Sequence, residues 1–154
     1  MQTEWRREEY IVSTEPSRID LDVVHGFLST CYWAEGIPRE VVARSIEHAL
    51  CFGLYHGDRQ IGFARVITDR ATFAYLGDVF VLDAYRGRGL AAWLMEVVHA
   101  HPELQGLRRW VLLTRDAHAL YRKTGYAALA KPERYMERWT PNVYATKNPG
   151  ADAR

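Results

Sequence analysis

The segment from Phe73 to Ala100 constrains the fold more strongly than any other part of the chain, because it combines a buried strand, a tight turn and a helix. The nearly unbroken apolar run from Tyr75 to Leu82 is typical of a strand that is buried on both faces. From Leu90 the apolar residues recur at helical spacing, which predicts a helix over 90–100. A strand and a helix joined in this way form a unit of α/β folds.

The turn between these two elements has the features of an anion-binding site. Its two glycines allow the backbone to approach a ligand closely, and the first N–H groups of the helix have no partner inside it. Two arginines add full charge and can contact phosphate oxygens in a bidentate manner. A plain solvent-exposed turn is the alternative. The sequence therefore predicts a diphosphate site at Arg86, Gly87, Arg88, Gly89, Leu90 and Ala91.

Two short motifs occur about thirty residues apart. The first is Arg86-x-x-Gly89-x-Ala91, and the second is the segment 117–126, which reads Ala-His-Ala-Leu-Tyr-Arg-Lys-Thr-Gly-Tyr. They resemble the Q/R-x-x-G-x-G/A and A-x-x-L-Y-x-x-x-G-F/Y motifs of the GNAT superfamily of acyl-CoA-dependent N-acetyltransferases. This resemblance covers roughly residues 10–139 and implies acetyl-CoA as the cosubstrate. No metal is expected, because the His99 and His101 pair has no third ligand nearby in the sequence.

The hydrophobic pattern and the resemblance together predict the architecture. The expected fold is α/β and GNAT-like: a mixed, mostly antiparallel, twisted sheet of six to seven strands flanked by about four helices, in the order β-α-α-β-β-β-α-β-α-β-β. Strands are expected at 10–14, 50–55, 60–68, 73–82, 107–114, 126–129 and 135–139, and helices at 20–31, 39–49, 90–100 and 116–124. Asp20 and Asp116 are the expected helix N-caps.

The composition limits the domain count and the class of partner. The chain has 154 residues, of which 48% are apolar and 25% charged, and this predicts one domain over 1–139 with a flexible C-terminal tail over 140–154. The net charge of +1 gives no reason to expect nucleic acid as a partner. No apolar run is long enough for a membrane span, and the N-terminus resembles no signal peptide, so we expect a cytoplasmic protein. A homodimer is compatible with the sequence.

The resemblance implies that the strand over 73–82 binds the extended part of the cofactor. In the GNAT fold the strands that flank the crossover splay apart, and the pantetheine amides pair with the backbone of the first strand. By position in the motif, Val79 and Val81 would supply this backbone. Gly77 and Asp78 interrupt the apolar run and could mark a bulge where the acyl carbonyl rests. Asp78 could equally be a satisfied polar group of the strand.

Tyr121 stands where the family often has a tyrosine near the cofactor sulfur. An O–H donor there can protonate the departing thiolate, so the resemblance implies a catalytic role for Tyr121. Packing of Tyr121 on the sheet is the alternative. The position seven residues earlier is Thr114, where the family frequently has Asn. No motif identifies a general base among Asp78, Glu35, Glu47 and His118.

The loop over 32–38 would frame the acceptor pocket if the resemblance holds. Tyr32 and Trp33 can stack on an acceptor, and Glu35 can bind an ammonium group, although the two aromatic residues could instead seal the core. Asp78 is the fourth candidate for binding the acceptor.

The expected reaction is transfer of an acetyl group from acetyl-CoA to a primary amine of a small or amino-acid-like molecule, by direct attack in a ternary complex. Acetylation of a protein N-terminus or a lysine is one alternative. A non-catalytic acyl-CoA-binding module is another. An RNA-binding arginine–glycine box is disfavoured, because the motif is single and the chain is nearly neutral.

Overall fold

A computed structural model describes residues 2–145 of the 154-residue chain. Within these residues six strands form one sheet, namely β1 (Glu4–Arg7), β2 (Tyr10–Ser13), β3 (Leu50–His56), β4 (Arg59–Thr68), β5 (Phe73–Val81) and β6 (Arg109–Leu112). The α-helices of the same residues are α1 (Leu21–Leu28), α2 (Arg39–Glu47), α3 (Leu90–Ala100) and α4 (His118–Arg122). Short 3₁₀ helices occur at Pro16–Arg18, Asp83–Tyr85, Pro102–Leu104 and Pro132–Arg134.

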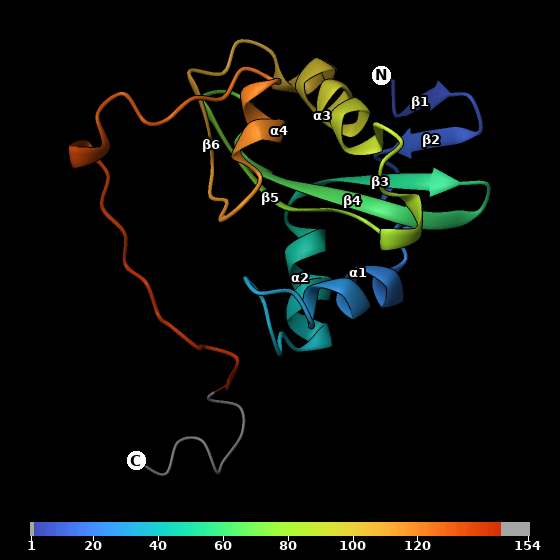
Figure 1. The fold of residues 1–154 in the computed structure, drawn as a ribbon, viewed down its shortest axis with the longest axis horizontal. Coiled ribbons are helices and arrows are strands. Elements are labelled where there is room, and N and C mark those ends of the chain that lie inside the picture. The colour runs from blue at the N-terminus through green and yellow to red at the C-terminus, as the bar shows by residue number, and fades with distance from the viewer. Residues whose placement is uncertain (1, 146–154) are drawn as a thin grey trace.

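The strands lie in the sheet in chain order, from β1 to β6. All neighbouring pairs are antiparallel except β5 and β6, which are parallel and are connected through α3. Helices α3 and α4 lie on one face of the sheet, and α1 and α2 lie on the other (Figure 1). The mixed, mostly antiparallel GNAT-like α/β fold expected from the sequence is therefore confirmed.

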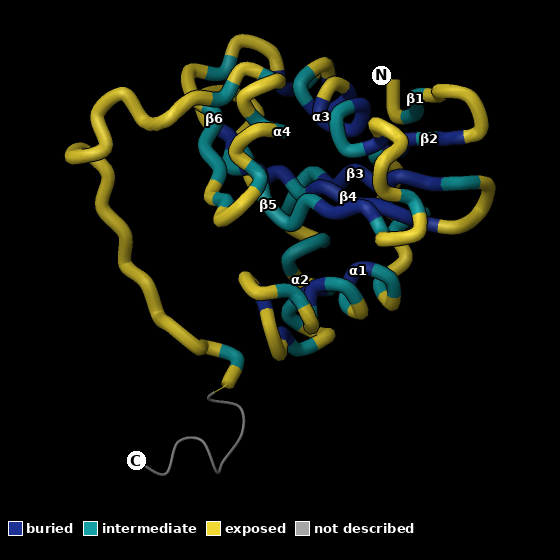
Figure 2. Tube along the Cα trace, in the orientation of Figure 1, coloured by how far each residue is buried: buried dark blue, intermediate teal, exposed yellow. Residues whose placement is uncertain are grey.

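The sheet separates two apolar clusters, and the buried residues follow its central strands (Figure 2). The larger cluster lies under α3, where Leu94 and Met95 are fully buried against the sheet. The smaller cluster lies under α1 and α2, where Val24 and Val42 pack with Phe63 of β4. Strands β3 and β4 are buried on both faces, which explains their nearly continuous apolar sequence.

The structure corrects the strand assignment at both ends of the chain. Residues 126–129 and 135–139 form no strand, because nothing within the described residues pairs with them. Conversely, β1 was not predicted, because Glu4–Arg7 contains only one apolar residue. Its backbone hydrogen bonds with β2 stabilise the strand even though its sequence lacks an alternating apolar pattern. The sheet has six strands, within the predicted six to seven, but it includes β1 and lacks the two strands predicted after α4.

The helix boundaries also differ in detail from those predicted. Asp20 caps α1 as expected, since its carboxylate accepts hydrogen bonds from the N–H groups of Asp22 and Val23. Asp116 does not cap α4, because that helix begins at His118 and no side chain caps its N-terminus. Residues 146–154 of the predicted tail lie outside the described residues. None of the described helices has the length and apolar character needed to cross a membrane.

Candidate active site

Strands β5 and β6 pair along only part of their lengths. The pairing runs from Phe73 opposite Arg109 to Leu76 opposite Leu112, where β6 ends, while β5 continues to Val81. Among the described residues no strand pairs with residues 77–81 on this side. The edge of β5 that faces away from β4 is therefore unpaired beyond Leu76 among the described residues, at the place where the resemblance implied a gap.

The backbone of β5 is directed into this gap at two of the predicted positions. The N–H of Leu82 donates to the carbonyl of Ile61 on β4, at 2.8 Å. Because successive residues of a strand point their backbone groups to opposite neighbours, those of Val81 and Val79 point away from β4. The carbonyl of Val81 accepts a hydrogen bond from Nε of Arg86, at 3.2 Å. Buried backbone groups need partners, so this edge of β5 suits an extended ligand that contains amides.

A bulge divides β5 at the start of the gap. Ala64 of β4 is opposite two residues of β5, Asp78 and Val79, and Asp78 has a φ of 55°. The extra residue reverses the alternation of side chains, so that Leu76 before the bulge and Val81 after it pack on the same cluster. The bulge predicted at Asp78 is therefore present.

The carboxylate of Asp78 holds two elements together. One oxygen accepts a hydrogen bond from Nε1 of Trp33 at 2.9 Å, and the other accepts one from Nε of Arg65 at 2.8 Å. The side chains of Asp78 and Arg65 are only 11% and 18% exposed, so this ion pair is largely removed from water. Asp78 thus links the bulge to β4 and to the loop between α1 and α2. Both of its oxygens are occupied, as expected of a satisfied polar group.

The loop before α3 has the backbone geometry expected of an anion site. Gly87 and Gly89 have φ values of 80° and 74°, and Gly89 is the N-cap of α3. A side chain at either position would be strained by the positive φ, although no heavy atom lies within 4 Å of the added carbon. The first intrahelical bond runs from Trp93 N–H to Gly89 carbonyl, which leaves the N–H groups of Leu90 and Ala91 available.

Both arginines of this loop contact other parts of the chain. Arg86 forms an ion pair with Asp83 at 3.0 Å, and its side chain remains 60% exposed. Arg88 donates to the hydroxyl of Tyr10 at 2.9 Å, and this hydrogen bond raises the pKa of its guanidinium. Arg86 and Arg88 are held by different partners, so their two guanidinium groups do not point toward one common position.

Tyr121 approaches the gap from the α3 face. It packs against the larger cluster. Burial raises the pKa of its phenol to about 12, and electrostatic interaction with the Tyr32 phenol makes a smaller contribution in the same direction. Its hydroxyl has no hydrogen-bond partner among the described residues. Tyr32 belongs to the loop between α1 and α2, and its hydroxyl accepts a hydrogen bond from the N–H of Arg115, after β6, at 3.1 Å. Tyr121 is therefore a packing residue, the alternative that the sequence left open, and its phenol is protonated at neutral pH.

The loop over 32–38 brings together two of the three residues predicted there to bind the acceptor. Tyr32 and Trp33 are 45% and 42% exposed, and their rings meet edge to face at 5.1 Å. Glu35 is exposed and has no hydrogen bond or ion pair within the described residues. Arg115, which the sequence did not single out, lies over the Tyr32 ring at 3.8 Å. The loop is thus bonded to β5 through Trp33 and Asp78 and to the segment after β6 through Tyr32, whereas Glu35 is exposed to solvent.

Arg65 was also missed, although a signal for it exists. A charged residue within the apolar run of β4 requires a buried partner, and this requirement points to an acidic residue on a neighbouring strand.

Neither cysteine has the low thiol pKa expected of a catalytic nucleophile. Burial raises the pKa of the Cys51 thiol to about 12 and also raises that of Cys31, so neither is an activated nucleophile.

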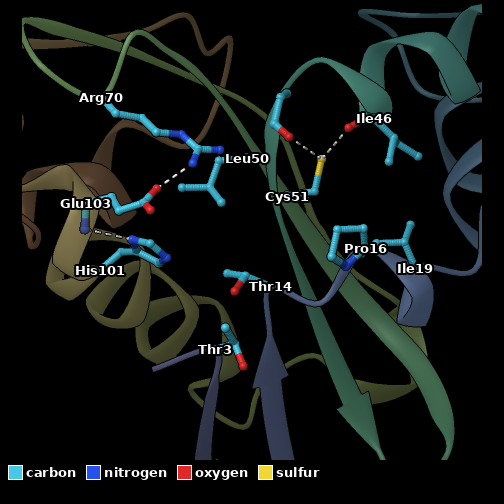
Figure 3. A pocket seen from close by; sticks show the side chains of 11 residues that line it. Thr3, Thr14, Pro16, Ile19, Ile46, Leu50, Cys51, Arg70, His101 and Glu103 are labelled. Carbon is cyan, nitrogen blue, oxygen red and sulfur yellow. Dashed lines mark hydrogen bonds and ion pairs between the residues drawn. The ribbon is translucent and has the colours of Figure 1, made fainter. Parts of the chain in front are cut away.

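A separate cavity of about 230 Å³ lies at the end of the sheet where β4 turns into β5 (Figure 3). Its lining includes Thr14, Leu50, Arg70 and the buried His101. It shares no residue with the predicted site, whose glycine loop follows the opposite end of β5. In the part of the chain that the structure covers, no group of three or more His, Cys, Asp or Glu residues could hold a metal ion.

Comparison with known proteins agrees with this geometry. Residues 47–128 match the family described as "Acetyltransferase (GNAT) domain". A curated protein of Gibberella zeae, whose name proposes an acetyltransferase, is 32% identical over 142 residues, covering 77% of this chain and 79% of that protein. A GNAT-family crystal structure from Xanthomonas campestris pv. campestris is 51% identical with a TM-score of 0.86, covering 88% of this chain and 96% of that one.

More distant structures share the fold. Glucosamine-6-phosphate N-acetyltransferase of Arabidopsis thaliana is 15% identical with a TM-score of 0.62, over 84% of this chain and 97% of that chain. The family match spans more than half of the sequence, and the Gibberella relative covers more than two thirds of it. The chain therefore belongs to the GNAT family and is a transferase of the N-acetyltransferase type.

Proposed function

We propose that the chain transfers an acetyl group from acetyl-CoA to a primary amine of a small molecule, by direct attack in a ternary complex. Proteins of this family generally use acetyl-CoA as the donor. The observation that carries the proposal is the second half of β5, which pairs with β4 on one edge but with no described strand on the other, and which leads directly to the glycine loop and to α3. An extended ligand with two amides can pair with the free edge of β5, and a diphosphate that follows the amides can bind at the N-terminus of α3.

The residues along β5 and the loop fit such a donor. The backbone groups of Val79 and Val81 would pair with the amides of its pantetheine arm. The carbonyl of Val81 can accept a second hydrogen bond beside that of Arg86, because a carbonyl oxygen has two lone pairs. Backbone N–H groups at 87–91 would bind the diphosphate, and the exposed guanidinium of Arg86 would add charge beside them.

The reaction requires a proton donor for the sulfur and a neutral amine. Acetyl-CoA supplies a thioester whose carbon accepts the amine lone pair and whose carbon–sulfur bond then breaks. Tyr121 would donate its hydroxyl proton to the departing sulfur, since a phenol is protonated at neutral pH and burial raises its pKa further, to about 12. Solvent would return a proton to Tyr121 and remove the surplus proton from the amine. Asp78 would act by holding the bulge and Trp33 in place.

The acceptor would enter on the face of α1 and α2. Tyr32 and Trp33 expose aromatic surface there, and Glu35 adds a free carboxylate farther along the loop. Stacking on these rings suits a small organic amine, and the carboxylate suits its cationic form before deprotonation. A protein N-terminus or a lysine would meet the same groups, and acceptor screening distinguishes the two classes.

The diphosphate assignment can be tested with a pair of glycine variants. Gly89 and Gly106 have φ values of 74° and 75°, and neither has a heavy atom near the added carbon. Both Gly89→Val and Gly106→Val introduce the same backbone strain, but only the first alters the proposed site. We expect Gly89→Val to weaken CoA binding at least about tenfold by calorimetry, whereas Gly106→Val binds as the wild type. Equal affinity in all three proteins would overturn the assignment.

Activity must be measured separately from binding. Release of free thiol from acetyl-CoA in the presence of a panel of amines would support the transferase. Cofactor binding without thiol release for any amine, peptide or lysine acceptor would favour an acyl-CoA-binding module instead.

A further inference from the structure

The cavity at the end of the sheet where β4 turns into β5 lies apart from the proposed active site (Figure 3). Its walls come from the segment after β2, the last turn of α2, the first residues of β3, the turn between β4 and β5, and the segment after α3. These parts are distant in the sequence and meet only in the folded domain. One side of the cavity is polar and the other is apolar (Figure 3).

The polar side contains a buried histidine with one free nitrogen. His101 is 2% exposed, and its ring packs against Trp5 and Phe52 with centroid distances of 5.8 and 5.6 Å. Its Nδ1 accepts a hydrogen bond from the N–H of Glu103 at 3.1 Å, so the neutral ring carries its proton on Nε2. Burial lowers the pKa of the ring, which favours this neutral form.

The Nε2–H group of His101 is directed into the cavity. It has no hydrogen-bond partner among the described residues. Every fully enclosed side-chain nitrogen or oxygen of those residues does have a partner, so Nε2 must open onto the cavity that its residue lines. Figure 3 shows this nitrogen on the side of the ring that faces Thr14 and Pro16. The cavity therefore contains a hydrogen-bond donor that the chain itself leaves unused.

Arg70 supplies a positive charge to the same side. It lies in the turn before β5, and its side chain is 47% exposed. One terminal nitrogen of the guanidinium donates to the carboxylate of Glu103. Because a guanidinium has five N–H donors, others stay available. Glu103 therefore fixes both donors of this side, His101 through its backbone N–H and Arg70 through its carboxylate.

The opposite side carries no charge. Cys51 lies there, and burial raises the pKa of its thiol to about 12, so the thiol is neutral. Its sulfur has only weak contacts, with the carbonyls of Ile46 at 3.7 Å and Ala49 at 3.9 Å. Hydrocarbon side chains complete this side, namely those of Pro16, Ile19 and Ile46 (Figure 3). A ligand that fits both sides has a polar end and a short apolar end.

We propose that the cavity binds a small organic acid. Its carboxylate accepts hydrogen bonds from Nε2 of His101 and from the guanidinium of Arg70, and its short hydrocarbon part lies against Pro16 and the two isoleucines. A carboxylate suits the polar side because both groups there are donors, and hydrogen bonds between charged groups are the stronger ones. An amine is disfavoured, since the carboxylate of Glu103 is already paired.

The volume of the cavity limits the size of the acid. An apolar cavity of about 150 Å³ holds benzene. The cavity of about 230 Å³ therefore admits roughly six to nine non-hydrogen atoms. A carboxylate with about four to six carbon atoms has this size, whereas acetyl-CoA is many times larger. The acid is thus a ligand distinct from the cofactor.

The site does not depend on the proposed acetyl transfer. Arg70 precedes β5 and His101 follows α3, whereas the glycine loop joins the other ends of these two elements. A bound acid connects β5 and α3 on the side of the domain that lies away from that loop. Its binding can therefore be measured without cofactor or acceptor.

The test measures binding of hexanoate to the full chain by calorimetry, with 1-hexanol as the uncharged comparison. We expect saturable binding of hexanoate and at least about tenfold weaker binding of the alcohol. In His101→Asn the side-chain oxygen can still accept from the N–H of Glu103, but the Nε2 donor is lost. We expect this variant to bind hexanoate at least about tenfold more weakly. His48→Asn, at an exposed histidine outside the cavity, is the matched control and should bind as the wild type.

Arg70→Gln provides a second variant at a half-exposed position, where folding is not at risk. It should also weaken hexanoate binding at least about tenfold. No saturable binding to the wild type at about 10 mM hexanoate, or equal affinity in the wild type and both cavity variants, would overturn the proposal.

A competition experiment separates this cavity from the proposed active site. Gly89→Val should bind hexanoate as the wild type does, because its substitution lies in the glycine loop. Saturating CoA should likewise leave the affinity for hexanoate unchanged. Displacement of hexanoate by CoA would locate the acid in the proposed active site and would rule out the cavity as its site.

Discussion

The ion pair between Asp78 and Arg65 permits a prediction whose magnitude follows from the structure. In Asp78→Asn the backbone conformation should persist, because Asn tolerates a φ of 55° better than most residues. The substitution removes the charge that faces Arg65, which is 18% exposed. Loss of one partner from a buried pair costs about 3–5 kcal/mol, but the Asn oxygen still accepts one hydrogen bond, so we expect a loss of about 2 kcal/mol.

Thermal unfolding is the direct assay for this prediction. For a chain of this length, 2 kcal/mol corresponds to a fall in Tm of roughly 4–8 °C. The KM for the acceptor should also rise several-fold. Asn offers one oxygen in place of two, so Trp33 and Arg65 compete for it and the loop that carries Trp33 is held less firmly. Glu35→Gln removes an exposed carboxylate of the same loop that has no partner, and it should leave Tm unchanged.

A double-mutant cycle isolates the pair from other effects of each substitution. Arg65→Met together with Asp78→Asn should be destabilised by less than the sum of the single variants, because no unpaired charge remains in the double variant. Additive losses would refute the coupling. An unchanged Tm in Asp78→Asn would refute the argument that this pair fixes the bulge.

Two further predictions concern buried phenols. Tyr121→Phe should lower turnover by roughly 10–10³-fold with little change in CoA affinity, as measured by thiol release and calorimetry, and a wild-type rate would remove Tyr121 from the chemistry. The folded-state pKa of Tyr121 and of Tyr55 is raised to about 12 by burial, above the ordinary value of 10, so their burial contributes full stability below pH 10 and loses it as the pH rises toward 12. Chemical unfolding at a series of alkaline pH values should show this decline, and Tyr55→Phe should flatten it.

Local patterns were sufficient to predict the central unit of the fold. The helix over 90–100 has the predicted boundaries, because its start is fixed by Gly89 and its apolar residues keep helical spacing to Val98. The bulge at Asp78 was also predictable, since a glycine and a charged residue interrupt an otherwise apolar strand. These features are decided by neighbours in sequence.

The rest of the site depends on contacts between distant residues. The Tyr32 hydroxyl accepts a hydrogen bond from the N–H of Arg115, 83 positions away, and no periodicity in either segment contains that information. The bond between Trp33 and Asp78 likewise spans 45 positions. Strand propensity over 135–139 failed as a predictor, because a strand also needs an edge to pair with. Strand β1 shows the converse, since pairing with β2 outweighs its weak apolar pattern.

The chain-order arrangement of the strands determines how the molecule can assemble during synthesis. Each strand adds to the edge left by the previous one, so no strand has to enter between two that are already paired. Growth therefore proceeds in one direction as the chain emerges from the ribosome. A nascent chain arrested before Arg109 could hold the sheet from β1 to β5 and hence one wall of the gap, but not the wall that β6 and α4 later add. The second wall of the gap is thus acquired only after β5 has been synthesised, on a scaffold that can already be in place.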